Sequence, residues 1–312
     1  METDSKNNPT VLTPRALRAW PLPAADEGGD KESRGRVLIV GGSAETPGAV
    51  LLAAEAALRA GAGKLRLAVG RSLAPRLAVA VPEARVFGLP ETADGEIAPE
   101  AAERVAELAG VVQSVVFGPG MIAEDNAARL MRDVLPRLAE TAVVLDAAAM
   151  TCVKEDAAAL HHLGGRVILT PHAGEMANIL CVGKDEVGQD PVTTARRVAA
   201  DLRATVALKG RETFIAAPDG VLYANRAGNN GLATSGSGDV LAGLIAGLAA
   251  RGADAAQAAA WGVALHARAG DALARRVGAL GYLARELAAE VPALLRALTA
   301  QPAARRRRSG GA

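Results

Sequence analysis

The fold of this chain is decided by the stretch GNNGLATSGSGD at residues 228–239, which runs directly into the apolar segment VLAGLIAGLAA at residues 240–250. Small residues let backbone N–H groups approach an anion, and the amino end of a helix adds its positive dipole. A dense glycine run that gives way to an apolar helical segment favours an anion-binding turn over a flexible loop. We therefore predict an anion hole at Gly236, Ser237 and Gly238.

The stretch differs from two common phosphate-binding loops. No GxxxxGK[ST] motif is present, and Gly236-Ser237-Gly238 lacks the third glycine of a dinucleotide-binding fingerprint. Asp239 follows in the first turn of the predicted helix. A carboxylate there can cap the helix, or it can take a proton from a substrate hydroxyl beside the bound anion. Both roles stay open from the residues alone.

Strands and helices alternate along the chain, which predicts an α/β fold with a mostly parallel sheet. The predicted strands are residues 36–40, 64–69, 115–117, 142–145, 166–169 and 205–208, followed by a hairpin at 213–217 and 221–224. The predicted helices are residues 14–20, 48–60, 127–138, 191–203, 238–250, 255–274 and 281–298. No repeat or central linker interrupts this order. We expect one domain over residues 1–302 and a disordered, arginine-rich tail at 303–312.

The carboxyl ends of the predicted strands carry polar and small residues. They are Gly42-Ser43, Gly118-Pro119-Gly120, Asp146, Pro171-His172 and Lys209-Gly210. Ligands of an open parallel sheet bind at these ends, so one crevice is expected to gather all five segments. His172 and Lys209 are interpreted as functional. Asp146 either binds Mg²⁺ through water or steadies a loop, and the sequence does not separate these roles.

The other histidines, His161, His162 and His266, have no such setting and are given no functional role. Cys152 and Cys181 lie in no metal-binding or redox motif. We interpret both as small buried hydrophobic residues, which excludes a disulfide-rich scaffold.

The composition and net charge of the chain indicate the kind of core it has and the classes of binding partner to expect. Half of the 312 residues are hydrophobic and only 2% are aromatic, so the core must consist of many small contacts between alanine-rich helices and a Val/Leu sheet. The net charge of +1 gives no reason to expect nucleic acid or an anionic membrane surface. Neither a signal peptide nor a membrane span is apparent, and we expect a cytoplasmic protein.

The motifs, taken in order, resemble those of the ADP-dependent NAD(P)H-hydrate dehydratases, which belong to the ribokinase-like superfamily. The matching segments are VLIVGGS (37–43), PGA (47–49), AGAG (60–63), GPG (118–120), LDA (145–147), LTPHAGE (169–175), LKG (208–210) with Thr213, GNNGLATSGSGD (228–239) and GYLA (281–284). A GPG or KG segment alone is weak evidence for the family. The segment at 169–175 that contains His172, followed by the glycine-rich stretch at 228–239, is specific evidence. The resemblance covers about residues 10 to 300.

The resemblance implies a ribokinase-like three-layer α/β/α sandwich and an enzyme, a lyase, that repairs damaged cofactor. In this family, ADP phosphorylates the ring hydroxyl of the S epimer of hydrated NADH or NADPH, phosphate then leaves to restore NAD(P)H, and AMP is released. It implies Asp239 as the base and Ala49, Gly120, His172 and Asp239 at the hydrate. It also implies a nucleotide site formed by Lys209, Gly210, Arg211, Glu212, Thr213 and Gly238.

By the same resemblance we expect ADP as co-substrate with Mg²⁺, although no residue is assigned as a metal ligand. We also expect a homo-oligomer, namely a tetramer. Many relatives carry an epimerase domain, and the 35 residues before the first predicted strand are too few for one, so a separate epimerase is expected as a pathway partner. Two alternatives remain: a ribokinase-like kinase of a vitamin-precursor alcohol, and a non-catalytic nucleotide-binding module.

Overall fold

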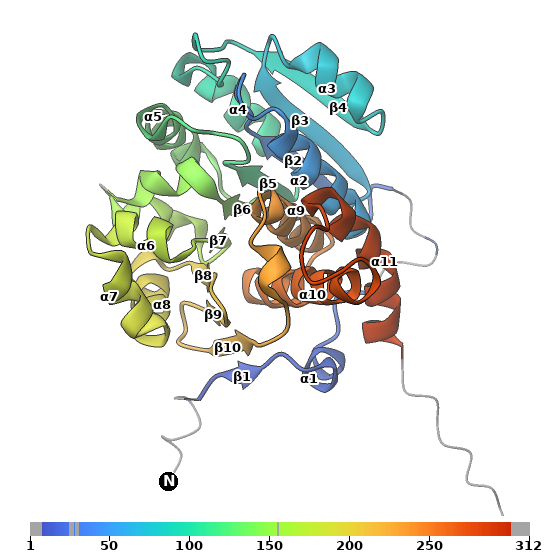
Figure 1. Ribbon diagram of the computed structural model, residues 1–312. Coiled ribbons are helices and arrows are strands. Elements are labelled where there is room, and N and C mark those ends of the chain that lie inside the picture. Colours follow the sequence, from blue (N-terminus) through green and yellow to red (C-terminus); the bar gives the residue numbers. More distant parts are fainter. Residues whose placement is uncertain (1–7, 25–27, 29–30, 155, 301–312) are drawn as a thin grey trace, which may run out of the picture.

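The computed structural model describes residues 8–24, 28, 31–154 and 156–300. Its strands form a single sheet in the order β1-β10-β9-β8-β7-β6-β5-β2-β3-β4 (Figure 1). The strands are β1 (Thr10–Val11), β2 (Arg36–Val40), β3 (Lys64–Gly70), β4 (Ala84–Leu89), β5 (Ser114–Phe117), β6 (Ala142–Leu145), β7 (Val167–Leu169), β8 (Thr205–Leu208), β9 (Thr213–Ala216) and β10 (Leu222–Asn225). All neighbouring strands are parallel except those that pair with β9.

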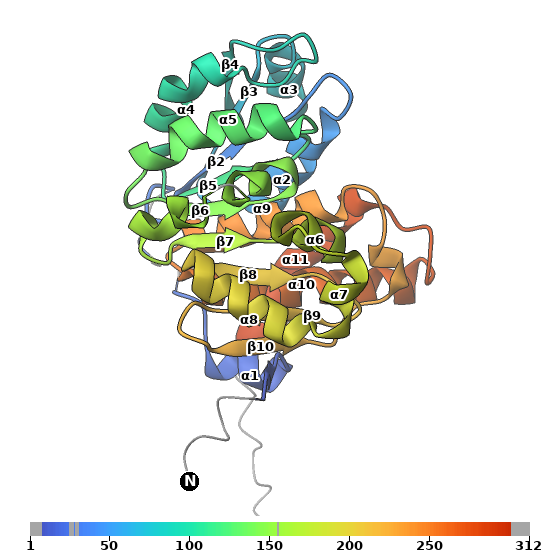
Figure 2. The ribbon, with the colours of Figure 1, turned by 90° about the vertical axis from the view of Figure 1, so that its left-hand side faces the viewer.

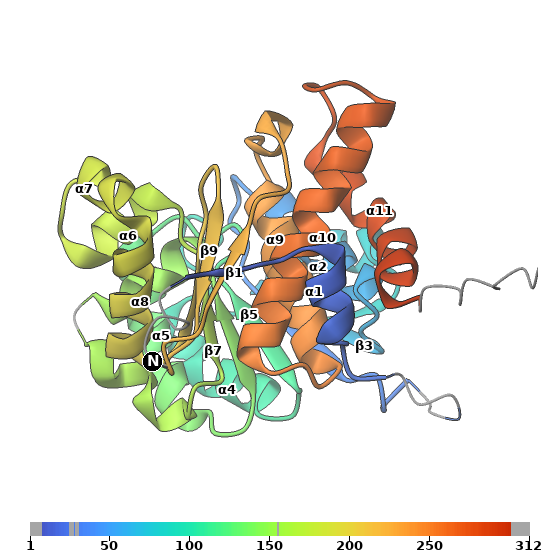
Figure 3. The ribbon, with the colours of Figure 1, turned by 90° about the horizontal axis from the view of Figure 1, so that it is seen from below.

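Helices cover both faces of the sheet, which makes three layers (Figures 2 and 3). One face carries α4 (Ala102–Ala109), α5 (Glu124–Val134), α6 (Ala173–Leu180), α7 (Lys184–Gln189) and α8 (Pro191–Leu202). The other carries α2 (Gly48–Arg59), α3 (Ala74–Ala80), α9 (Ser237–Ala250), α10 (Ala255–Arg276) and α11 (Ala284–Thr299), with α1 (Pro14–Ala19) beside α11. The predicted α/β/α sandwich is confirmed.

Successive side chains of a strand point to opposite faces of the sheet, so the core consists of two halves, one on each face. Val37 and Ile39 of β2 belong to the half under α2, α9 and α10, whereas Leu38 and Val40 belong to the half under α4 and α5. A strand buried on both faces reads as a continuous apolar run, and for this reason β2 is recognisable from the sequence RVLIV.

Glycines bring α9 unusually close to its helical neighbours. A β-carbon at Gly243 would lie 2.1 Å from the carbonyl oxygen of Ala53 on α2, and one at Gly247 would lie 2.5 Å from that of Ala57. On the opposite side, a β-carbon at Gly262 of α10 would lie 2.5 Å from Cγ1 of Ile245. This tight packing fixes the position of α9, and therefore of its amino end, relative to the sheet.

Several elements lie in parts of the chain for which the sequence predicted nothing. These are β1, β4, α3, α4, α6 and α7. Asp190 is the N-cap of α8, and its carboxylate accepts a hydrogen bond from the Thr193 N–H at 3.0 Å. The single domain over residues 1–302 stays a prediction, and the tail at 303–312 lies outside the described residues. Of the helices in the described part of the chain, none is long and apolar enough to cross a membrane.

Substitution of Gly243 by alanine tests the close approach of α9 and α2. The added methyl group would collide with backbone, so we expect the free energy of unfolding to fall by about 1–3 kcal/mol. Scanning calorimetry measures the change. Gly188→Ala on α7 is the matched control, because its β-carbon would meet no heavy atom within 4 Å. Equal stability of Gly243→Ala and the wild type would contradict the packing described here.

Candidate active site

The five segments predicted to share a crevice follow strands β2, β5, β6, β7 and β8, which are adjacent in the sheet. The Gly42 N–H donates to the carbonyl oxygen of Pro119 at 2.8 Å. Gly118 has φ +123°, and a β-carbon there would lie 1.8 Å from the carbonyl oxygen of Asp146. The Lys209 N–H donates to Pro171 O at 2.7 Å. The structure therefore brings these five strand ends together at one edge.

Lys209 joins three of these elements. Its Nζ lies 3.5 Å from Oδ1 of Asp146 at the end of β6 and 3.6 Å from Oε2 of Glu175 on α6. The Asp146 carboxylate is buried and also accepts a hydrogen bond from the Thr170 hydroxyl at 2.6 Å. Burial alone would lower the pKa of Lys209, but the carboxylates of Asp146 and Glu175 outweigh it and hold this pKa above its usual value. Lys209 is therefore a fixed cation.

His172 caps α6, and this capping fixes its ring. Its Nδ1 accepts hydrogen bonds from the backbone N–H groups of Gly174 at 3.0 Å and Glu175 at 3.1 Å, while the Glu175 carboxylate accepts from the His172 N–H at 2.7 Å. This is a reciprocal capping box. Because Nδ1 accepts two bonds, the neutral ring carries its proton on Nε2. The side chain is 58% exposed, and its Nε2 lies 3.6 Å from Oε1 of Glu175.

The glycine-rich loop that precedes α9 is held from behind by α10 and by Tyr282. Asp271 of α10 accepts hydrogen bonds from Gly228 N at 3.1 Å and from Asn229 Nδ2 at 3.2 Å. Oδ1 of Asn229 accepts in turn from the Gly231 N–H at 3.0 Å and from the Tyr282 hydroxyl at 2.9 Å. The loop is thus braced before it reaches the amino end of the helix.

The predicted anion hole forms the start of α9. Gly236 is the N-cap with φ +86°, a value that favours glycine, and Ser237 and Gly238 open the helix. A β-carbon at Gly238 would lie 3.6 Å from Lys209 Nζ and 3.9 Å from Asp146 Oδ2. The helix dipole and the Lys209 ammonium therefore act on the same small volume, as binding of a phosphoryl group requires.

Asp239 lies in the first turn of α9, beside these charges. Desolvation and the nearby Asp146 carboxylate raise the pKa of Asp239 to about 7, against an opposing effect of Lys209. A carboxylic acid with a pKa near 7 exchanges its proton readily at physiological pH, which suits a general base. The sequence alone left capping and base roles open, and this electrostatic setting favours the base.

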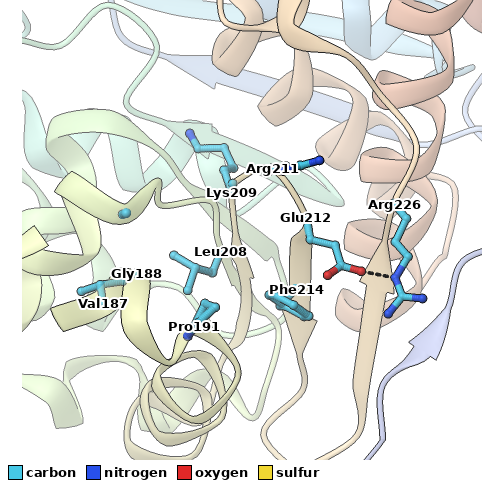
Figure 4. A pocket seen from close by; sticks show the side chains of 11 residues that line it. Val187, Gly188, Pro191, Leu208, Lys209, Arg211, Glu212, Phe214 and Arg226 are labelled. Atoms are coloured by element: carbon cyan, nitrogen blue, oxygen red, sulfur yellow. Dashed lines mark hydrogen bonds and ion pairs between the residues drawn. The ribbon is translucent and has the colours of Figure 1, made fainter. Parts of the chain in front are cut away.

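A cavity of about 640 Å³ opens beside Lys209 (Figure 4). Its lining includes the predicted nucleotide residues Lys209, Gly210, Arg211 and Glu212. Apolar side chains from β8, β9, the start of α6 and the α7–α8 region also line it, and Glu212 forms an ion pair with Arg226, another lining residue. Thr213 begins β9 and does not line the cavity, and Gly238 adjoins it only through Lys209.

Two predicted substrate residues, Ala49 and Gly120, are neighbours at the other end of the edge. A β-carbon at Gly120 would lie 3.1 Å from Cβ of Ala49, and the Thr46 hydroxyl donates to the carbonyl oxygen of Gly120 at 2.9 Å. The edge therefore carries two separate groups of predicted residues: Ala49 and Gly120 after β2 and β5, and Lys209 to Glu212 after β8.

Two residues that contact the candidate site, His266 and Glu175, were given no role from the sequence, and the burial of the cysteines was overestimated. His266 of α10 touches Ser237 in the anion hole, and Glu175 contacts both Lys209 and His172. The signal for His266 was its place as a polar residue in a helix stretch of small and apolar residues, AAAWGVALHARAG. The interpretation of Cys181 as buried was wrong, because it is exposed at the end of α6, where it adopts a left-handed conformation, and Cys152 is half-buried.

Comparison with known proteins first defines the class. The fold matches a solved ribokinase-like superfamily protein from Enterococcus faecalis with a TM-score of 0.80 and 26% identity, covering 94% of this chain and 97% of that one. The structure is therefore ribokinase-like.

Closer relatives identify the family. The family model described as NAD(P)H-hydrate dehydratase matches residues 37–293. The ADP-dependent (S)-NAD(P)H-hydrate dehydratase of Xanthomonas campestris pv. campestris is 51% identical over 91% of this chain and 96% of its own length. The solved ADP/ATP-dependent NAD(P)H-hydrate dehydratase of Bacillus subtilis, co-crystallised with ATP and Mg²⁺, has a TM-score of 0.78 and 30% identity, covering 94% of this chain and 99% of that one. The chain belongs to the NAD(P)H-hydrate dehydratase family.

The charges around Asp239 yield a direct prediction. Asp146→Asn removes a neighbouring negative charge, so the pKa of Asp239 should fall below about 7, whereas Lys209→Met should raise it further. Carbon-13 NMR titration of the aspartate carboxyl groups measures both shifts. Glu186→Gln on the exposed surface of α7 is the control and should leave this pKa unchanged. An Asp239 pKa that does not respond to Asp146→Asn would contradict the coupling.

Proposed function

We propose that this enzyme dehydrates the S epimer of hydrated NADH or NADPH at the expense of ADP and so restores NAD(P)H, with release of AMP and phosphate. The observation that supports this proposal most directly is the position of Asp239, a carboxylate with a pKa of about 7 at the mouth of an anion hole. The names of the Xanthomonas and Bacillus relatives specify the substrate class.

The reaction begins with proton transfer from the ring hydroxyl of the hydrate to the Asp239 carboxylate. The hydroxyl oxygen forms a bond to the β-phosphorus of ADP while the bond to the AMP oxygen breaks. Amides at the start of α9 stabilise the charge on the transferring phosphoryl group. Phosphate then leaves the ring carbon, a proton leaves the adjacent carbon, and the double bond of the dihydronicotinamide is restored.

The nucleotide is proposed to occupy the cavity of about 640 Å³, with its phosphates directed toward Lys209 and Gly238. Gly210, Arg211 and Glu212 line the same cavity, and Thr213 follows them at the start of β9. The fixed positive charge of Lys209 would bind the phosphates, and the apolar wall of the cavity would pack against the adenine. ADP rather than ATP is the proposed donor.

Mg²⁺ fits this arrangement as an ion carried by the nucleotide. In the described part of the chain, no three His, Cys, Asp or Glu side chains are grouped to hold a metal. The carboxylates of Asp146 and Glu175 nevertheless stand beside Lys209, and Mg²⁺ typically binds one or two carboxylates together with phosphate oxygens. These two residues would hold the ion, which supplies neutralising charge to the phosphates.

The hydrate is proposed to lie between Gly120 and Asp239. Gly120 packs closely against Ala49 and Thr46, so the ring is proposed to contact this edge through backbone and small side chains, with the partly exposed His172 as a further donor. An enzyme specific for the S epimer leaves the R epimer unrepaired, so a separate epimerase is the proposed pathway partner in the cytoplasm. We also propose that four copies of this chain form a homotetramer.

Asp239→Asn tests the base. Loss of a general base typically costs about 10²–10⁴-fold in rate, and we expect a loss of that size in kcat with hydrated NADH and ADP. Recovery of the near-ultraviolet absorbance of the dihydronicotinamide ring measures turnover. In the wild type, kcat/KM should rise with pH through about 7, because Asp239 accepts a proton only when ionised. Lack of recovery with either ADP or ATP would instead favour a small-molecule kinase or a binding module.

Arg211→Ala tests the nucleotide cavity. A charge-assisted hydrogen bond is worth about 1.5–3 kcal/mol, so loss of this guanidinium should raise KM for ADP roughly tenfold or more with a smaller effect on the KM for hydrate. Steady-state kinetics with each substrate varied in turn separates the two constants. Arg137→Ala is a matched control, because Arg137 donates to the carbonyl oxygen of Asp133 in the α5 region, away from the cavity. An unchanged KM for ADP would remove Arg211 from the nucleotide site.

A further inference from the structure

His266 is a titratable side chain at the anion hole for which the proposed reaction has no role. It projects from α10 toward the first residue of α9. Its Nε2 lies 2.9 Å from Oγ of Ser237 and 3.0 Å from the carbonyl oxygen of the same residue. Ser237 is 6% exposed and precedes Gly238, so this contact lies at the start of α9, where the anion hole is predicted.

The two distances determine where the imidazole proton is. A carbonyl oxygen can only accept, so a ring nitrogen 3.0 Å away from it must carry a hydrogen. Desolvation lowers the pKa of His266 to about 4 against the opposing hydrogen bond to Ser237, and the Lys209 ammonium lowers it further. The ring is therefore neutral at physiological pH, and its single proton resides on Nε2.

This proton placement also fixes the direction of the serine hydroxyl. Because Nε2–H faces both oxygens of Ser237, Oγ is the acceptor in its contact with His266. The hydrogen of the hydroxyl then remains available, because among the described residues Oγ forms a side-chain hydrogen bond with His266 and with no second acceptor. A buried hydroxyl normally donates as well as accepts.

We propose that the Ser237 hydroxyl donates its hydrogen bond to the transferring phosphoryl group, and that His266 is the positioning residue that orients it for this purpose. The anion hole then contains a side-chain donor in addition to the amides of α9. This inference rests on the proposed function and deepens it. A hydrogen bond from a neutral donor to a charged oxygen is stronger than one between neutral groups, so the effect should be largest when phosphoryl charge develops.

Kinetics of Ser237 variants provide the first test. Removal of one donor from an oxyanion hole typically costs about 10²-fold or more in kcat. We expect a loss of that order for Ser237→Ala, with KM values for ADP and hydrate within about threefold of the wild type because uniform binding is little affected. Ser237→Thr keeps a hydroxyl and should recover most of the rate that alanine loses. Wild-type kcat in Ser237→Ala would overturn the proposal.

A double-mutant cycle separates positioning by His266 from a general effect on structure. His266→Phe should lower kcat about tenfold in the wild-type background and hardly at all in the Ser237→Ala background, because its effect passes through the hydroxyl. His266→Gln keeps a side-chain N–H and should restore part of the rate. His161→Phe is the matched control, since His161 also contacts a backbone carbonyl, that of Asp201, but outside the site. Equal losses from His266→Phe in both backgrounds would overturn the positioning role.

Two measurements do not depend on turnover. Long-range proton–nitrogen NMR should show His266 in its Nε2–H form from pH 5.5 to 8 (about one and a half to four units above its pKa of about 4). AMP with aluminium fluoride, which mimics the transferring phosphoryl group, should bind the wild type at least about tenfold more tightly than Ser237→Ala. An Nδ1–H tautomer, titration above pH 6 or equal affinities would overturn the inference. Failure of the wild type to turn over hydrated NADH would count against the proposed function alone.

Discussion

The active-site edge depends on one shared cation, the ammonium group of Lys209. It lies 3.5 Å from Asp146 and 3.6 Å from Glu175, and so ties the ends of β8 and β6 to the start of α6. Its side chain is 21% exposed and that of Asp146 only 5%, so both charges have lost most of their water. Breaking such a pair by removing one partner leaves a buried charge, which costs about 3–5 kcal/mol. Removal of any one of the three partners is therefore expected to destabilise this edge.

Each partner of Lys209 also acts on another group in the site. Glu175 binds the backbone N–H of His172 and so completes the cap that fixes the histidine ring. Asp146 raises the pKa of Asp239 while Lys209 lowers it, so the proton affinity of the proposed base is a balance between two members of the same cluster. Asp146 therefore has two roles: it forms an ion pair that supports the structure, and it raises the pKa of the proposed base. The sequence left two roles open for Asp146, a metal ligand or a support for a loop.

The parts of the fold that were predictable are those with a local physical signal. Strands buried on both faces, such as Arg36–Val40 and Thr205–Leu208, read as continuous apolar runs, and their predicted bounds match the structure. The edge strand β4, with the sequence ARVFGL, mixes charge, aromatic ring and glycine and gives no such run. Strand β1 has two residues, and only its pairing with β10 in three dimensions makes it a strand.

The same distinction holds at the site. Glycine-rich strand ends and the start of α9 carry a signal in the sequence, because only small residues permit the close approaches observed there. The contact of His266 with Ser237 spans 29 residues and joins two helices, so it depends on how α9 and α10 pack. Cys181 was misjudged because a helix end that turns in a left-handed conformation is decided by the three-dimensional course of the chain.

The low aromatic content and the glycine-rich site have a common physical cause. Layers that approach as closely as α9 and α2 leave little room for rings between them, so alanine and glycine predominate at their contact. Small residues at the strand ends likewise allow two backbone segments to approach closely, as Gly118 approaches the carbonyl oxygen of Asp146. The buried tyrosine Tyr282 supports the glycine loop from behind through Asn229 and is not positioned as a stacking surface for a ligand. We therefore expect recognition at this edge to rely on amides, a few fixed charges and hydroxyls whose direction the packing determines, and for this reason the proposed orientation of the Ser237 hydroxyl by His266 would matter to the chemistry.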